Sequence, residues 1–200
     1  MTRIGIYGGT FSPPHNGHIA AAKAFMEQMW LDILYVIPTA TPPHKEMDMP
    51  VSAEHRLNMC RLAFSQMEGV YVSDMEILRG GKSYTVETLR ELSGKDRRLF
   101  LLCGTDMVLT LDRWREPAEI FSLSYPVYIR REKDPATEKA IIQKIGEYHQ
   151  KYGKMVRKIL VEPIELSSNQ VRKALQKGES VDQMVPFAVK KYIQDNHLYV

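Results

Sequence analysis

The chain has 200 residues, with 27 Lys and Arg against 24 Asp and Glu, and a formal net charge of +3. This length fits one domain that can bury a core without cross-links. The near balance of charges argues against the concentrated basic surface of a nucleic-acid binder.

The two cysteines, Cys60 and Cys103, sit among apolar neighbours and form no Cys-x-x-Cys pair. We therefore expect buried free thiols in a reducing compartment rather than a disulfide framework or a zinc site. No apolar run reaches 18 residues, and no basic and apolar leader precedes the first apolar segment. These features predict a cytoplasmic protein that does not cross a membrane.

Short apolar runs rich in β-formers alternate along the chain with segments of helical periodicity. The predicted strands are Arg3–Tyr7, Ile33–Pro38, Val70–Asp74, Arg98–Cys103, Pro126–Arg130 and Arg157–Val161. The predicted helices are Gly17–Trp30, Ser52–Met67, Val86–Leu92, Asp106–Leu111, Ala136–Lys151, Ser168–Gln176 and Pro186–Gln194. This alternation predicts right-handed βαβ units and an α/β, Rossmann-like, doubly wound parallel sheet. Two helices follow the last strand, which predicts a C-terminal helical cap over the ligand edge of a single domain, residues 1–200.

The loop after the first strand holds the densest group of unusual residues, Gly8-Gly9-Thr10-Phe11-Ser12-Pro13-Pro14-His15-Asn16-Gly17-His18. Open parallel sheets bind ligands at the carboxyl ends of their strands. The paired glycines let the backbone approach a ligand, and Asn16 is predicted to cap the next helix, whose first-turn N–H groups attract phosphate. His15 and His18 are spaced to face the same anion. The loop is neither a Walker A loop nor a Gly-x-Gly-x-x-Gly loop.

A second motif, Leu166-Ser167-Ser168-Asn169-Gln170-Val171-Arg172, opens a helix after the last strand. Ser167 or Ser168 is predicted to cap this helix, and its N-terminus is again suited to an anion. Arg172 lies about one turn in, where its guanidinium could hold phosphate oxygens bidentately. The alternative for this segment alone is an ordinary capped surface helix.

These two motifs resemble the His-x-Gly-His and Ile-Ser-Ser-Thr-x-Ile-Arg motifs of the nucleotidylyltransferase superfamily. The resemblance implies that His15 and His18 bind the triphosphate of ATP and stabilise the transition state of nucleotidyl transfer. It also implies that Ser167, Ser168 and Arg172 hold ATP phosphates.

The glycine-rich part of the first loop, Gly8, Gly9, Thr10 and Phe11, is expected to belong to the same ATP site. Two positions depart from the superfamily pattern. Ser12 stands where the family usually has Asp, and Asn169 stands where it has Thr. Ser12 can still form hydrogen bonds but lacks a charge, so no metal chemistry is assigned to this position. No metal-binding residue is predicted elsewhere in the chain.

Further stretches resemble the bacterial nicotinate mononucleotide adenylyltransferases and occur in that family's order: Thr41-Pro42-Pro43-His44-Lys45, Ser83-Tyr84-Thr85, Gly104-Thr105-Asp106 and Trp114. Taken singly, each could be a surface turn, a helix cap or a core tryptophan. An arginine in the family's third helix matches Arg56. The resemblance is weakest from about Arg131 to Glu165, where Arg131-Glu132 replaces the family's Pro-Gly.

That family resemblance implies a role for each of these residues. Lys45 is expected to bind phosphate, and Gly104 and Asp106 to contact the nucleotides. Thr85 and the backbone amides beside Tyr84 are expected to bind the nicotinate carboxylate. Trp114 is expected to stack on the pyridine ring.

The implied reaction transfers the adenylyl group of ATP to nicotinate mononucleotide, giving deamido-NAD (nicotinate adenine dinucleotide) and pyrophosphate, with Mg²⁺ bridging phosphate oxygens. The acceptor phosphate has a second pKa of about 6 and needs no general base at neutral pH. The expected partners are these small molecules, with neither nucleic acid nor membrane, and the oligomeric state stays open.

A phosphopantetheine adenylyltransferase or a cytidylyltransferase would share both phosphate motifs but not the Ser-Tyr-Thr and Trp features. A non-catalytic nucleotide-binding regulator is disfavoured because His15, His18 and Arg172 are all present.

Overall fold

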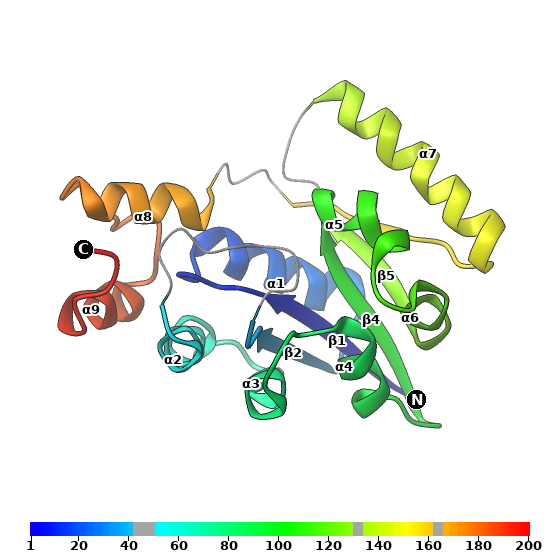
Figure 1. Ribbon diagram of the computed structural model, residues 1–200, viewed down its shortest axis with the longest axis horizontal. Coiled ribbons are helices and arrows are strands. Elements are labelled where there is room, and N and C mark those ends of the chain that lie inside the picture. Colours follow the sequence, from blue (N-terminus) through cyan, green and yellow to red (C-terminus); the bar gives the residue numbers. More distant parts are fainter. Residues whose placement is uncertain (42–50, 130–133, 162–165) are drawn as a thin grey trace. The chain divides into compact units, whose positions relative to one another are not determined.

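The computed structural model describes residues 1–41, 51–129, 134–161 and 166–200 (Figure 1). The chain divides into two compact units. Unit 1 comprises Met1–Tyr7, Ala21–Leu34 and Tyr84–Pro163, and unit 2 comprises Gly8–Ala20, Tyr35–Ser83 and Ile164–Val200. A single domain of 200 residues stays a prediction.

The sheet has six strands in the order β3-β2-β1-β4-β5-β6. The strands are β1 Thr2–Gly9, β2 Ile33–Pro38, β3 Val70–Val72, β4 Arg97–Gly104, β5 Ser124–Ile129 and β6 Arg157–Ile159. Strand β4 pairs in parallel with β1 and β5, and β5 pairs in parallel with β6. This is the strand order of doubly wound dinucleotide-binding folds, so the predicted Rossmann-like fold class is confirmed.

The helices are α1 Asn16–Gln28, α2 Ala53–Phe64, α3 Met75–Arg79, α4 Thr85–Leu92, α5 Thr105–Thr110, α6 Pro117–Leu123, α7 Pro135–Tyr152, α8 Ser168–Gln176 and α9 Phe187–Asp195. A 3₁₀ turn, η1 Leu111–Arg113, follows α5. The predictions missed α3, η1 and α6. Each is too short to show helical periodicity, although Pro117 at the first turn of α6 is a typical start signal.

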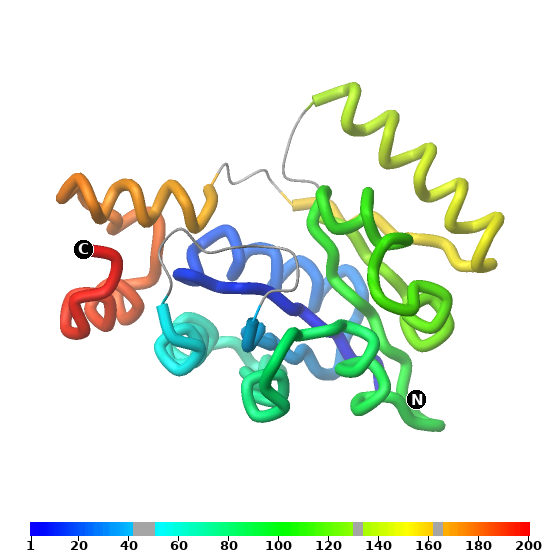
Figure 2. The backbone as a smooth tube through the Cα atoms, viewed as in Figure 1, coloured from blue at the N-terminus to red at the C-terminus, as the bar shows by residue number. Residues whose placement is uncertain are grey.

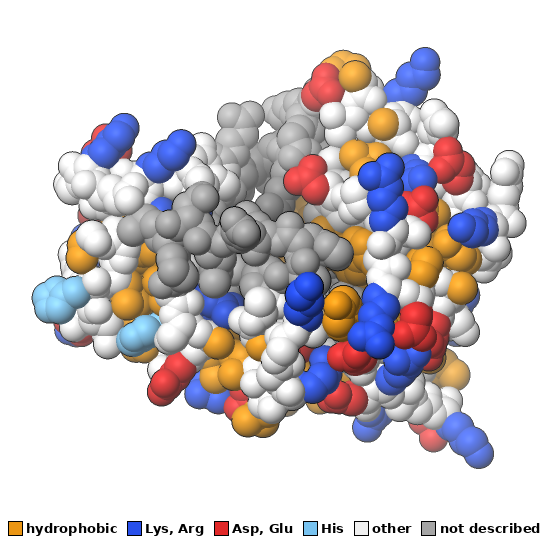
Figure 3. All heavy atoms as spheres, viewed as in Figure 1, with side chains coloured by type: hydrophobic (Ala, Val, Ile, Leu, Met, Phe, Trp, Pro, Cys, Tyr) orange, Lys and Arg blue, Asp and Glu red, His pale blue; other side chains and the backbone are white. Residues whose placement is uncertain are grey.

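Strand β4 forms the centre of unit 1. Its residues Leu99 to Cys103 are all buried, as expected for a parallel strand covered on both faces. Helix α5 packs against β4 and α7, and α6 packs against α4 and β5. On the face shown in Figure 3, basic and acidic side chains lie among one another over α4 and α6. There Arg90 pairs with Glu116 and Glu119.

In unit 2, α2 packs against α9 and β3. Figure 2 shows α9, in red, beside α2, in cyan. A hydrogen bond of 2.9 Å joins His55 Nδ1 and the Tyr192 hydroxyl across this contact. Helix α8 bonds to the loop after β1 through Ser168 and Arg172. The predicted cap of two C-terminal helices over the ligand edge of the sheet stays a prediction.

Both cysteines are buried free thiols, as predicted. Burial raises the pKa of the Cys103 thiol to about 12 and also raises that of Cys60. Among the residues that the structure describes, no helix is both long and apolar enough to cross a membrane.

The backbone of β1 requires a glycine at position 5. A Cβ there would lie 2.4 Å from Leu31 Cδ1 and 2.8 Å from Leu34 Cδ1, both in the buried core of unit 1. We expect Gly5→Ala to lower the free energy of unfolding by about 1–3 kcal/mol, because the extra methyl group overpacks the core.

The control is Gly146→Ala, on the exposed middle of α7, where a Cβ would meet nothing within 4 Å. This change should stabilise the chain by about 0.5–1 kcal/mol, since alanine favours a helix over glycine. Urea unfolding of both variants measures the two effects. A Gly5→Ala variant as stable as the parent chain would contradict the close packing at β1.

Candidate active site

The loop after β1 is folded around Phe11. The ring of Phe11 is buried and packs edge-on against His18 and Phe64, at centroid distances of 5.0 and 6.4 Å. A Cβ on Gly9 would lie 3.0 Å from this ring, whereas one on Gly8 would meet nothing within 4 Å. The lack of a side chain at Gly9 therefore leaves room for the Phe11 ring. At Gly8 the space beside the backbone is unoccupied by protein atoms. Any ATP contact by Phe11 is expected to come from its backbone.

A fully buried arginine in α2, Arg56, anchors this loop. Its nitrogens donate to three backbone carbonyls: Nη1 to Thr10 at 2.9 Å, Nη2 to Ala40 at 3.0 Å and Nε to Val51 at 3.3 Å. Burial lowers the pKa of Arg56 from its ordinary value. The sequence placed Arg56 only by family position. The available signal in the sequence is that Arg56 lies among the apolar residues of a predicted helix. A charged side chain in that place needs buried hydrogen-bond partners.

Three side chains from the C-terminal segment hold the next part of the loop. Arg172 Nη1 donates to the Ser12 carbonyl and Ser168 Oγ donates to the Pro13 carbonyl, each at 2.9 Å. The Ser12 and Tyr199 hydroxyls are hydrogen-bonded to each other at 2.9 Å. Side-chain donors thus take the carbonyl oxygens on both sides of Phe11. No sequence pattern indicated Tyr199, which lies at a left-handed backbone position.

Helix α1 begins with a histidine at its N-cap. The His15 carbonyl accepts from His18 N–H at 2.8 Å, and His18 Nδ1 accepts from His15 N–H at 3.1 Å. The bond to His18 Nδ1 is one half of a capping box, in which the side chain of the third helical residue accepts from the N–H of the N-cap residue. The predicted cap, Asn16, is wrong: Asn16 is the first helical residue. Its backbone and side-chain amides donate to Met184 and Gln183 carbonyls.

The two histidine rings lie together. They are buried and stacked, with centroids 3.7 Å apart and planes inclined by 30°. Because His18 Nδ1 accepts a hydrogen bond, the proton of its neutral ring lies on Nε2. The structure thus places the two rings side by side and assigns the tautomer of His18, whereas their predicted contact with one anion stays a prediction.

The start of α8 resolves which serine is the cap. Ser167 Oγ accepts from Gln170 N–H at 3.2 Å, and Gln170 Oε1 accepts from Ser167 N–H at 2.7 Å, which is a capping box. Ser168 is instead the first helical residue, and its hydroxyl reaches the loop after β1. Of the residues predicted to hold phosphate, Ser168 and Arg172 therefore bond to the loop after β1, whereas Ser167 bonds to Gln170 within its own helix.

The residues expected to bind the pyridine nucleotide lie in unit 1. Tyr84 is at the N-cap of α4 in extended conformation and makes no side-chain cap bond, and Thr85 is the first helical residue. The guanidinium of Arg115 lies over the Tyr84 ring, 4.6 Å from its centroid, and also pairs with Glu87. The start of α4 is thus flanked by a cation as well as by its own amide groups.

The other predicted residues of unit 1 lie around α5. Gly104 is at its N-cap and Asp106 is exposed in its first turn. Trp114 is half-buried and ends η1, with its N–H donating to the Leu111 carbonyl. Lys45 lies outside the described residues, so its predicted phosphate contact has no structural description.

Comparisons with known proteins agree with the motifs and the strand order. A family model described as cytidylyltransferase-like matches residues 6–174. A protein of Geobacter sp. (strain M21) named "Probable nicotinate-nucleotide adenylyltransferase" is 36% identical over 212 residues, covering 99% of this chain and 98% of its own length. One of the same name from Desulfatibacillum aliphaticivorans is 36% identical, covering 99% of this chain and all of its own length.

Among solved structures, Plasmodium falciparum nicotinic acid mononucleotide adenylyltransferase complexed with NaAD matches with a TM-score of 0.76. That match covers 100% of this chain and 98% of the other at 20% identity, so it bears on the fold. The family model covers most of the chain, and the two bacterial relatives match it from end to end. The chain therefore belongs to the cytidylyltransferase-like nucleotidylyltransferases and, within them, to the nicotinate-nucleotide adenylyltransferase family.

Proposed function

We propose that the chain transfers the adenylyl group of ATP to nicotinate mononucleotide, forming nicotinate adenine dinucleotide (deamido-NAD) and pyrophosphate in NAD biosynthesis. The observation that carries this proposal is the loop after β1, in which two stacked histidines begin a helix and the carbonyls are held by Arg56 and Arg172. Family membership and the names of the full-length relatives support the choice of acceptor.

In this reaction an oxygen of the acceptor phosphate attacks the α-phosphorus of ATP. The new P–O bond forms as the bond to the bridging oxygen breaks, and pyrophosphate leaves with the electron pair. No proton has to be removed from the acceptor, so catalysis comes from alignment and from stabilising developing negative charge. We assign that stabilisation to His15 and His18, and the holding of the outer phosphates to Arg172 and the start of α8.

Mg²⁺ is expected to enter with ATP. Among the described residues, no group of three or more His, Cys, Asp or Glu side chains is arranged to hold a metal ion. Phosphate oxygens and water are sufficient ligands for Mg²⁺, which seldom needs an all-protein cage. Bound to the triphosphate, the ion would neutralise part of its charge, and this chain's residues would orient the phosphates around it.

For the acceptor, we assign the nicotinate carboxylate to Thr85 and the first-turn amides of α4. We assign the pyridine ring to Trp114, and nucleotide contacts to Gly104, Asp106 and Lys45. ATP and nicotinate mononucleotide are small soluble metabolites, so we place the reaction in the cytoplasm and expect neither nucleic-acid nor membrane partners.

The first test is pyrophosphate release from ATP with one of three acceptors: nicotinate mononucleotide, pantetheine phosphate or none. We expect release with nicotinate mononucleotide alone. Release with pantetheine phosphate would move the chain to another branch of the superfamily. No release with any acceptor would point to a non-catalytic nucleotide-binding protein.

A second comparison sets nicotinate mononucleotide against nicotinamide mononucleotide. Amide groups at a helix N-terminus offer only donors and a partial positive charge, which a carboxylate satisfies and a carboxamide does not. The mismatch should lower kcat/KM for the nicotinamide form by about tenfold to a hundredfold. Equal kcat/KM values, or a preference for the amide, would remove the start of α4 from acceptor recognition.

The role of His18 is tested by two amide substitutions. His18→Asn places an oxygen near the position of Nδ1 and keeps the acceptor for His15 N–H, but it lacks the donor at Nε2. We expect it to lower kcat by roughly 10²-fold or more with little change in melting temperature, as when one donor to a developing charge is lost.

His18→Gln is the matched change, because its NH₂ group reaches the position of Nε2 while the cap acceptor is lost. It should keep a larger share of kcat and melt at a lower temperature. If His18→Asn turned over at a near-normal rate, His18 would be only a helix cap.

A further inference from the structure

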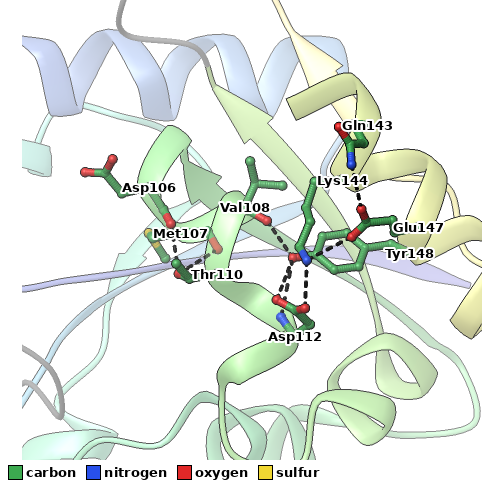
Figure 4. A network of polar contacts seen from close by, with 9 residues as sticks. All are labelled: Asp106, Met107, Val108, Thr110, Asp112, Gln143, Lys144, Glu147 and Tyr148. Atoms are coloured by element: carbon green, nitrogen blue, oxygen red, sulfur yellow. Dashed lines mark hydrogen bonds and ion pairs between the residues drawn. The ribbon is translucent and has the colours of Figure 1, made fainter. Parts of the chain in front are cut away.

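Helix α5 changes to a 3₁₀ turn just before the tryptophan expected to hold the pyridine ring. The α-helix ends at Thr110, η1 runs over Leu111–Arg113, and Trp114 follows directly. Figure 4 shows two side chains of α7, Lys144 and Tyr148, pointing toward this transition.

A tyrosine hydroxyl is inserted at the transition. Tyr148 Oη donates to the Val108 carbonyl at 2.8 Å and accepts from Asp112 N–H at 3.4 Å. Residues 108 and 112 are a pair that a continuing α-helix would join directly. A side chain inserted between such partners is a known cause of a helix break.

Other bonds hold the break in place. Thr110 Oγ1 donates to the Asp106 carbonyl at 2.8 Å, so a second hydroxyl takes a carbonyl of the last turn. Lys144, one turn before Tyr148, reaches Asp112 Oδ2 at 2.8 Å and Glu147 Oε2 at 2.9 Å (Figure 4). The turn is therefore attached to α7 both through its backbone and through the Asp112 carboxylate.

The surroundings of Tyr148 keep its hydroxyl in place as a hydrogen-bond donor. Its side chain is 1% exposed and its ring lies against Phe121, at a centroid distance of 5.0 Å. Burial raises the pKa of Tyr148 to about 12, so the hydroxyl keeps its proton at neutral pH.

A neighbouring tyrosine provides an internal control. Tyr152, one turn further along α7, stacks on Phe121 at 4.3 Å with the ring planes 10° apart. Its buried hydroxyl has no hydrogen-bond partner among the described residues. The two tyrosines share a helix and an aromatic cluster, but only Tyr148 bonds to the turn before Trp114.

We propose that Tyr148 is a positioning residue of the acceptor site, which sets the helix break after α5 and thereby the place of Trp114. This proposal rests on the proposed function, because it takes Trp114 to contact the pyridine ring. It assigns acceptor specificity in part to α7, a helix on which neither motif lies.

The experiment uses Trp114 as its own reporter. The chain has two tryptophans, and Trp30 is 74% exposed, so Trp30→Phe leaves Trp114 as the sole tryptophan. In this background, Tyr148→Phe and Tyr152→Phe are compared by titrating the fluorescence with nicotinate mononucleotide. Steady-state kinetics are measured for both substrates.

We expect Tyr148→Phe to shift the Trp114 emission and to raise Kd and KM for nicotinate mononucleotide by about tenfold, as buried partners of one hydroxyl are left unsatisfied. KM for ATP should stay within about twofold, and Tyr152→Phe should match its background. A purely structural role would lower the active fraction, and so kcat, without a selective rise in one KM.

Lys144→Met is a second variant, which removes the ion pair of Asp112 but keeps the Tyr148 hydroxyl and its bond to the Val108 carbonyl. It should raise KM for nicotinate mononucleotide in the same direction by a smaller factor. Unchanged Kd and KM in Tyr148→Phe, or equal changes for both substrates, would overturn the positioning role and leave the proposed function intact. A parent chain that neither binds nor consumes nicotinate mononucleotide would overturn both.

Discussion

The guanidinium of Arg56 is the contact on which the arrangement of unit 2 depends. It joins the carbonyls of Thr10, Ala40 and Val51, which belong to the loop after β1, the loop after β2 and the approach to α2. Burying a cation is costly unless hydrogen bonds satisfy its donors, and here three carbonyls do so. No ion pair among the described residues involves Arg56.

This arrangement explains why residues so far apart in sequence form one group. Ser168 and Arg172 hold the carbonyls of Pro13 and Ser12, and Tyr199 holds the Ser12 hydroxyl. These bonds restrict the conformations of the loop and so help to position the histidines at the start of α1. A site that needs no rearrangement stabilises developing charge more effectively than one that must reorganise.

A similar arrangement, in which a side chain bonds to a backbone carbonyl, occurs in unit 1. There the hydroxyl of Tyr148, rather than an arginine, takes the Val108 carbonyl and directs the chain toward Trp114. In both units a side chain distant in sequence captures backbone groups at the end of a regular element.

Local patterns predicted the strands well, because buried parallel strands are continuous apolar runs such as Leu99 to Cys103. They also found His15 and His18, whose spacing is itself local. The cap of α1 was misassigned because Asn is the stronger cap by preference, yet the amides of Asn16 are taken by Gln183 and Met184.

The contacts that shape the loop could not be predicted in this way. Arg172 and Ser12 are 160 residues apart, and only the folded chain brings them together. Tyr148 lies in a helix that was predicted, but nothing in a helical pattern says which hydroxyl enters a neighbouring helix end. Sequence patterns therefore indicated which residues could form the candidate site, but not the long-range bonds that support it.

The central claim is that Arg56 acts by holding carbonyls in place and not by its charge alone. Arg56→Lys separates the two, because lysine keeps the positive charge but lacks the planar guanidinium that reaches three carbonyls. The measurement is calorimetric titration with Mg²⁺ and ATP in the absence of acceptor, below the melting temperature of the variant. The account predicts an affinity at least about tenfold weaker than that of the parent chain, as a loop with released carbonyls would have to be ordered on binding. An unchanged affinity in the folded Arg56→Lys variant would contradict it.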